Sequence, residues 1–127
     1  MENLNIEATK YTPKIDFNVE TNILNIIGKS YPENTFEYYK PIVNWIEEYL
    51  ETIDDAVVLI NLDLEYLNSS SLKAYFDLFD LLEIAHDEGK NITINWIYDE
   101  ENDISEETGE DFIADFENLN ITLKIKG

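Results

Sequence analysis

Three consecutive serines, Ser69, Ser70 and Ser71, lie where a predicted strand ends and a predicted helix begins. A serine oxygen in this position can accept a hydrogen bond from the free N–H groups of the first helical turn, as an N-cap does. The same hydroxyl can carry a phosphate, because the helix dipole and Lys73 in the first turn favour negative charge there. The sequence leaves both interpretations open: helix capping alone, and phosphorylation.

A serine can also act as a nucleophile, which requires a base within hydrogen-bond reach. His86 is the only histidine, and it follows Ser69 by 17 residues on the same predicted helix. At the helical rise per residue the two side chains are roughly 25 Å apart, which excludes a Ser-His pair. Lys73 is four residues from Ser69, but no oxyanion-hole element accompanies such a dyad. A small serine hydrolase that uses Ser69 remains an alternative, although the sequence shows neither a base nor an oxyanion hole for this serine.

A second candidate site is the acidic segment 99–117, which holds ten acidic and no basic residues. Six of its side chains fall at the ligand positions of an EF-hand calcium loop: Asp99, Glu101, Asp103, Ser105, Glu107 and Glu110. Ile104 occupies the position where the tight turn of that loop requires glycine, and a predicted strand, not a helix, precedes it. The alternatives are a calcium-binding regulatory domain and a solvated acidic face that contacts a basic partner.

The composition limits the classes of partner. The chain has 8 basic and 28 acidic residues and a net charge of −20, and every basic residue is a lysine. We therefore expect no binding to nucleic acid or to anionic membranes, since both need a positive patch. The absence of cysteine removes disulfides, thiolate catalysis and zinc-thiolate sites, and without a glycine-rich phosphate loop we expect no cofactor.

Two features favour a cytoplasmic location. The longest aliphatic stretch, Ala56 to Ile60, is too short to span a membrane. The first residues are acidic and polar, unlike a signal peptide.

Hydrophobic periodicity predicts the elements that position these side chains. Period-two alternation predicts three short strands at 4–8, 15–19 and 23–27, with Gly28 ending the third. The capping pattern Asn34-x-x-Glu37 begins a predicted helix at 34–53, in which Pro41 predicts a kink or a later helix start. The remaining predicted elements are a strand at 57–67, a helix from Leu72 to about Gly89, a strand at 92–98, a helix at 105–117 and an edge strand at 121–125.

This order predicts one α/β domain over residues 1–127. Helix and strand alternate after the first three strands, which is typical of a mixed sheet with an antiparallel meander, a parallel remainder and helices mainly on one face. Phe112, Ile113 and Phe116 are predicted to face inward, and Trp45 and Trp96 to pack in the core. An alternative for the aromatic side chains is an exposed surface for a partner, made by Tyr31, Tyr38, Tyr39 and Trp45.

Several segments together resemble the SiaC-type bacterial regulatory phosphoproteins, over nearly the whole chain. The segments are Ile6 to Thr9, Thr12-Pro13-x-Ile15, Gly28 to Asn34, Trp45, Tyr66 to Ser71 and Asn95 to Glu101. The resemblance implies a STAS-like domain, related to anti-sigma-factor antagonists, with its phosphorylated residue at the start of a helix. The family commonly has threonine in this slot, within Asn-Thr-Ser-Ser. Here the slot holds Ser69, with Ser70 and Ser71 as alternatives, and Leu67 replaces the usual aromatic residue.

The resemblance also implies a non-enzymatic role in partner switching. A serine/threonine kinase of histidine-kinase-like fold phosphorylates such a protein, and a metal-dependent serine phosphatase reverses the modification. The unphosphorylated form binds an effector, which in the pathway that gives the family its name is a diguanylate cyclase that controls cyclic di-GMP and biofilm formation. We expect the partner-binding surface beside the phosphoacceptor, at Tyr66, Leu67, Asn68, Ser70, Ser71 and Lys73.

Overall fold

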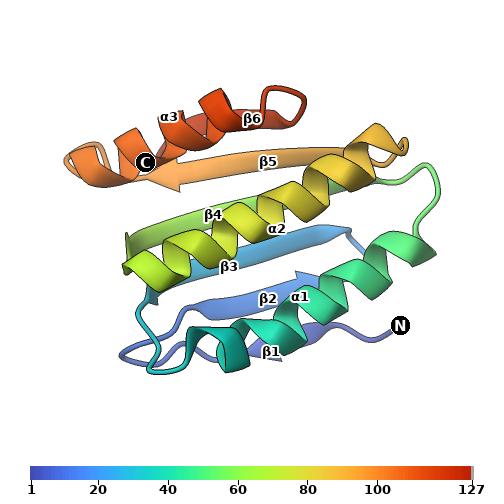
Figure 1. Ribbon diagram of the computed structural model, residues 1–127. Helices are drawn as coiled ribbons and strands as arrows, with labels where there is room; N and C mark the ends of the chain where they lie inside the picture. The colour runs from blue at the N-terminus through green and yellow to red at the C-terminus, as the bar shows by residue number, and fades with distance from the viewer. Residues whose placement is uncertain (127) are drawn as a thin grey trace.

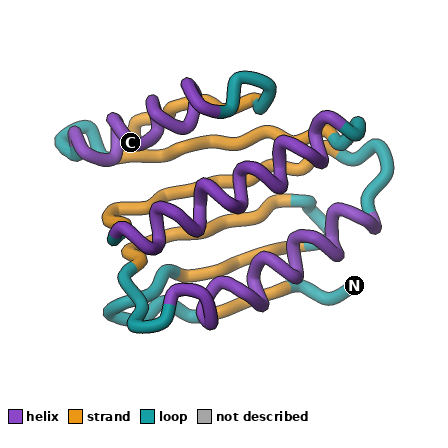
Figure 2. Tube along the Cα trace, in the orientation of Figure 1, coloured by secondary structure: helices purple, strands orange, loops and turns teal. Residues whose placement is uncertain are grey.

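The computed structural model describes residues 1–126, which form a mixed sheet and a layer of helices. The strands are β1 (Leu4–Ile6), β2 (Lys14–Asn18), β3 (Ile23–Ser30), β4 (Val57–Leu67), β5 (Asn91–Tyr98) and β6 (Asn120–Ile125). The helices are α1 (Thr35–Thr52), α2 (Ser69–Asp87) and α3 (Asp103–Asp115). The strands lie in sequence order across the sheet, and the helices all lie on one face of it (Figures 1 and 2).

The predicted division of the sheet is confirmed. β1, β2 and β3 pair antiparallel, and β3, β4, β5 and β6 pair parallel. Each parallel connection carries a helix. Because the strands advance in one direction across the sheet, crossovers of one hand place every connecting helix on the same face.

The core lies between this helical layer and the inner face of the sheet. Alternate residues of each central strand are buried, as for Val58, Ile60 and Leu62 of β4. The outer face carries a row of amides instead: Asn61 Nδ2 donates to Asn25 Oδ1 at 2.9 Å, and Asn95 Nδ2 donates to Asn61 Oδ1 at 2.9 Å. The alternation along each central strand therefore places apolar side chains toward the helices, and on the outer face it brings together a row of amides that satisfy one another.

The structure revises two predicted helix details. α1 begins at Thr35 and includes Pro41, so the predicted alternative of a helix start near Pro41 is wrong. Both Pro41 and Glu37, whose carbonyl loses its usual N–H donor, lie on the exposed side of α1, where water can take the place of the lost bond. In α3, Phe112 is buried but Ile113 is 37% exposed. The residue that approaches the sheet instead is Gly109, where an added Cβ would lie 2.6 Å from Trp96 Cδ1. Glycine is thus required there by packing.

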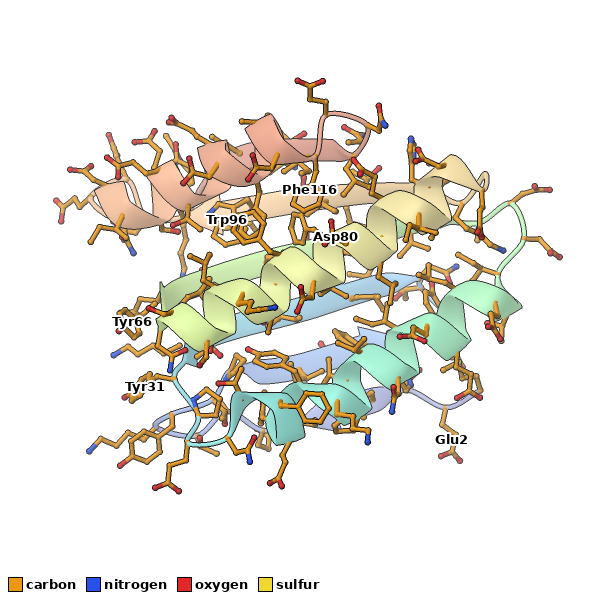
Figure 3. The ribbon with its side chains drawn as sticks, viewed as in Figure 1. Glu2, Tyr31, Tyr66, Asp80, Trp96 and Phe116 are labelled. Atoms are coloured by element: carbon orange, nitrogen blue, oxygen red, sulfur yellow. The ribbon has the colours of Figure 1, made fainter. Side chains whose placement is uncertain are left out.

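The aromatic side chains pack differently from the proposed exposed set. Trp96 is fully buried, and Figure 3 places it with Phe116 between α3 and the sheet. Trp45 is half-buried, and its Nε1 donates to the Glu2 carbonyl at 3.0 Å. Tyr39 is buried, so the predicted surface of Tyr31, Tyr38, Tyr39 and Trp45 does not form.

None of the helices within residues 1–126 combines the length and apolar character needed to cross a bilayer.

Candidate functional site

The predicted phosphoacceptor region lies at one edge of the molecule, where β3 and β4 end and α1 and α2 begin (Figure 1). We call this region the junction edge and define it as Ser30 and Tyr31, Thr35, and residues 66–73. The Asn68 N–H donates to the Ser30 carbonyl at 3.0 Å, which joins the two strand ends. Carboxyl ends of parallel strands are the usual position of binding sites in α/β sheets, and the junction edge has this position.

Asn68, not a serine, caps α2. Its Oδ1 accepts from the Ser71 N–H at 2.9 Å, and its carbonyl accepts from the Leu72 N–H at 2.9 Å. Asn34 and Asn102 cap α1 and α3 in the same way, with Oδ1 accepting at 3.1 Å in each. The prediction that a serine is the N-cap is therefore wrong. Because an asparagine already satisfies the helix end, the three serine hydroxyls are available for other roles.

The three serines have three different surroundings. Ser69, the first residue of α2, is exposed, and no hydrogen bond among residues 1–126 involves its hydroxyl. Ser70 is exposed too, but its Oγ lies 2.6 Å from Thr35 Oγ1 and donates to Asn68 Oδ1 at 3.2 Å. Ser71 is 0% exposed. The structure thus presents Ser69 to solvent without a competing partner.

Ser71 belongs to a chain of buried hydroxyls. Its Oγ lies 2.7 Å from Ser30 Oγ, and Ser30 Oγ lies 2.6 Å from the Tyr39 hydroxyl, which donates to the Tyr75 hydroxyl at 3.1 Å. We call these four residues the buried hydroxyl chain. Burial raises the pKa of the Tyr39 and Tyr75 phenols, so both stay protonated. Ser71 therefore reaches neither a kinase nor a partner in the folded protein, and its place among the expected site residues is a correction.

Tyr66 owes its exposure to a β-bulge. Gly28 pairs with Leu64 but Lys29 pairs with Tyr66, so Glu65 is an extra residue on β4. The extra residue reverses the alternation, and Tyr66 is 52% exposed instead of following Leu64 into the core. The Asn102 side chain donates to the Glu65 carbonyl at 3.0 Å and satisfies the bulge. A bulge therefore turns an aromatic side chain outward beside Ser69.

The exposed aromatic surface at the junction edge differs from the predicted one. Tyr31 and Tyr66 lie side by side at this edge (Figure 3) and make an edge-to-face contact with ring centroids 5.8 Å apart. Tyr11 contacts Tyr31 with ring centroids 5.2 Å apart. A hollow of about 300 Å³ beside Tyr66 is lined by Leu67, Leu72 and the exposed Ile104, among others. Tyr11 was missed, because nothing in the sequence places the β1–β2 loop against this edge.

Lys73 lies one helical turn after Ser69, on the same side of α2. Its Nζ forms an ion pair with Asp77 Oδ2 at 3.2 Å, and both side chains are largely exposed. Such a surface pair contributes little, so Lys73 is free to turn toward a new negative charge at Ser69. The amino end of α2 supplies further positive potential.

The structure contradicts the calcium-binding alternative. α3 begins at Asp103, so Asp103, Ser105 and Glu107 project from a helix and cannot form an EF-hand loop. Acidic and histidine side chains of residues 1–126 form no group of three that could hold a metal ion. Ser69 and His86 lie near opposite ends of α2, as predicted, so no Ser-His pair forms.

Comparisons with known proteins agree with the predicted resemblance. The family model for SiaC family regulatory phosphoprotein matches residues 6–126. An uncharacterized protein of Pseudomonas aeruginosa strain UCBPP-PA14 is 38% identical over 117 residues, which cover 91% of this chain and 90% of the relative.

Two structures from Pseudomonas aeruginosa share the fold. SiaC has a TM-score of 0.90 at 33% identity, over 99% of this chain and 100% of that chain. A chain from the crystal structure of the diguanylate cyclase SiaD in complex with its activator SiaC has a TM-score of 0.89 at 34% identity, over 97% of this chain and 99% of that chain.

Proposed function

The chain belongs to the SiaC family of regulatory phosphoproteins, and we propose that it is a non-enzymatic phospho-switch whose phosphoacceptor is Ser69. The observation that carries this assignment is the contrast among the serines. Ser71 is buried in hydrogen bonds, Ser70 is bonded to Thr35 and Asn68, and Ser69 is exposed without a partner among the described residues. A kinase can reach the Ser69 hydroxyl without breaking any of these hydrogen bonds.

Phosphorylation changes the local charge far more than the total charge. The phosphate adds about −1.5 to −2 to a protein of net charge −20, so the total cannot be the signal. Around Ser69, however, the exposed groups include the Tyr66 ring and Ile104, and the two exposed charged side chains Lys73 and Glu65 have opposite signs. The helix N-terminus stabilises a dianion there, but the phosphate stays hydrated. An apolar partner surface would have to remove this hydration, which costs free energy.

The proposed binding state is therefore the unphosphorylated one. Tyr31, Tyr66, Leu67 and Ile104 offer a neutral, partly apolar surface around the Ser69 hydroxyl, and aromatic side chains of this kind are common anchors of interfaces. Asn68 and Ser70 support the surface by capping α2 and by joining it to α1. Phosphorylation then lowers the affinity by desolvation and steric cost.

The proposed effector is a diguanylate cyclase. Support comes from the similar protein SiaC, which is an activator in complex with the diguanylate cyclase SiaD. A switch of this kind also needs a kinase and a phosphatase; we assign these roles to a serine/threonine kinase of histidine-kinase-like fold and a metal-dependent serine phosphatase, acting in the cytoplasm. The proposed effect on the cell is control of cyclic di-GMP and biofilm formation.

Binding to a diguanylate cyclase from the same organism tests the proposal. We expect Ser69→Asp to weaken the affinity by about tenfold or more, since an interface charge of this kind costs at least about 1.4 kcal/mol. Ser69→Ala should keep the affinity of the unmodified protein. The matched control is Thr122→Asp on exposed β6, which adds the same charge outside the junction edge and should have no effect. Equal affinities for the Ser69 variants would contradict the switch.

A further inference from the structure

α1 and α2 lie side by side in the same direction on the sheet (Figure 1). Two hollows lie between their outer surfaces. Toward the start of the helices, a hollow of about 310 Å³ is lined by Phe36, Val43, Ala74 and Asp77 among others. Toward their end, a hollow of about 550 Å³ is also lined by Asp77. Because Asp77 lines both hollows, they adjoin along the two helices, and we call them together the α1–α2 groove.

The floor of the α1–α2 groove is apolar. Leu50 and Ala85 are buried beneath its far part, and Leu81 is half-buried beside them. The aliphatic side chain of Ile84 is 61% exposed there, and Phe36 at the other end is 73% exposed. Large apolar side chains that line one groove mark an interaction surface more often than chance exposure.

The charge of the rim changes along the groove. The part near the end of the helices is lined by the carboxylates of Glu47, Glu51, Asp77, Asp80 and Glu88. Lys90 is the basic residue lining this part among those described, and its Nζ is already bonded to the Ile53 carbonyl. The carboxyl ends of α1 and α2 add further negative potential. The part near the start of the helices carries Lys40 and Asp77, which balance.

We propose that the α1–α2 groove binds an amphipathic helix of the effector, whose basic end lies over the acidic part of the groove and whose uncharged, apolar end points toward Ser69. This inference rests on the proposed function in one respect: the effector is taken to be the protein that supplies the helix. From Ala74 to Glu88 the groove follows α2 for about 20 Å, which matches roughly four turns of a partner helix. Helix-in-groove recognition of this kind uses apolar anchors spaced by three and four residues.

A second copy of this chain does not fit the groove. Within the described residues every helix has more acidic than basic side chains, and α3 has no basic side chain at all. A helix of the same chain would therefore meet like charge along the far rim. Charge complementarity selects a partner helix rich in lysine or arginine at one end.

The groove also explains how a phosphate can act on a basic partner. Thr35 and Ser70, bonded at 2.6 Å, link the starts of α1 and α2 at the near end of the groove, and Ser69 lies beside them. A phosphate on Ser69 would therefore face the apolar end of the partner helix and not its basic end. There the dianion meets groups that cannot replace its water, so it lowers the affinity even though the partner carries positive charge elsewhere.

A synthetic peptide tests the groove without any phosphate or cyclase. The probe is an amphipathic helix of about 16 residues, with leucines at three- and four-residue spacing and lysines confined to one half. Its twin replaces every lysine with glutamate. We expect the lysine peptide to shift backbone amide resonances of the facing sides of α1 and α2, and to bind about tenfold more tightly than its twin.

Variants of this protein complete the test. Ile84→Glu should weaken binding of the lysine peptide by about tenfold or more, because it puts a charge in the apolar contact. The matched control is Ile125→Glu, since Ile125 is a similarly exposed isoleucine, 57% exposed, on β6. It should bind the peptide as the unmodified protein does, and both proteins should unfold at the same urea concentration as the parent.

Three results would overturn the inference: no binding, equal affinity for the two peptides, or resonance shifts on α3 or on the outer face of the sheet. None of them bears on Ser69, since the assay contains no phosphate. A last arm uses the diguanylate cyclase itself. If Ile84→Glu weakens its binding, the effector supplies the helix; if the peptide binds the groove but cyclase binding is unchanged, the assignment to the effector is wrong while the Ser69 switch can still stand.

Discussion

Ser69 and Ser71 are the same residue type, two positions apart on the first turn of α2, yet their environments are opposite. An α-helix turns about 100° per residue, so side chains two positions apart point to nearly opposite sides. Ser69 points to solvent, and Ser71 points into the buried hydroxyl chain with Ser30. In this segment the orientation of the helix, not the residue type, therefore separates the proposed modification site from a structural group.

The two serines also depend on different parts of the molecule. Ser71 is fixed by long-range contacts, since its partner Ser30 lies 41 residues earlier in the chain. The orientation of Ser69 depends only on where α2 begins, and Asn68 caps that helix start. Changes at Ser71 should therefore act on stability, and changes at Ser69 on recognition.

The largest expected effect separates the two serines by stability. Ser71→Asp buries a carboxylate beside the Ser30 and Tyr39 hydroxyls, and we expect the free energy of unfolding to fall by about 3 kcal/mol or more. Ser69→Asp should leave it unchanged or raise it by about 0.5 kcal/mol, because an acidic side chain suits the first turn of a helix. Urea unfolding of both variants measures the difference. Similar losses in the two would show that Ser69 is also structural.

A smaller effect is expected at the cap that both serines share. Asn68→Ala removes the acceptor for the Ser71 N–H and should lower the free energy of unfolding by about 1 kcal/mol. Ser69→Ala removes no hydrogen bond among the described residues and should change it by less than about 0.5 kcal/mol. If Ser69→Ala were the more destabilising of the two, Ser69 and not Asn68 would be the cap.

The two tyrosines of the buried hydroxyl chain and the neighbouring Tyr38 should make the stability depend on pH in the alkaline range. Burial raises the pKa of Tyr39 and Tyr75, and burial and the neighbouring Tyr39 raise the pKa of Tyr38 to about 12. Their unfolded pKa is about 10. As the pH rises above this value the unfolded chain loses these protons first, so the stability, full below about pH 10, falls as the pH approaches the folded values.

Urea unfolding from pH 8 to pH 11 measures that slope, and at neutral pH the effect is absent. Tyr75→Phe should make the decline shallower, since one of the groups responsible is gone, even if the variant is less stable at neutral pH. An unchanged slope in Tyr75→Phe would mean that other groups cause the alkaline loss. Ser69→Ala is the control and should follow the unmodified protein at every pH.

Much of the fold was predictable because it depends on local periodicity. The apolar spacing in 34–53 and the alternation in 57–67 correspond to α1 and β4 within a residue or two. The division into antiparallel and parallel parts followed from the order of elements alone. The position of the three serines between a strand and a helix was likewise visible in the sequence.

What could not be predicted depends on contacts between distant segments. The extra residue Glu65 exists only in the register between β3 and β4, and the period-two pattern of β4 continues through Tyr66 as if no bulge were present. Gly109 has no side chain to reveal its contact with Trp96. The residue at which α2 begins decides which serine faces inward. The sequence does not fix that residue, because all four residues from Asn68 to Ser71 are good N-caps.

The most direct measurement is the position of the phosphate. The protein is incubated with ATP and the serine/threonine kinase of histidine-kinase-like fold from the same organism, and its phosphopeptides are mapped by mass spectrometry. The proposed switch predicts phosphate on Ser69, full loss of modification in Ser69→Ala and unchanged modification in Ser70→Ala. Phosphate on Ser70, on Ser71 or in another segment, with Ser69 unmodified, would contradict it.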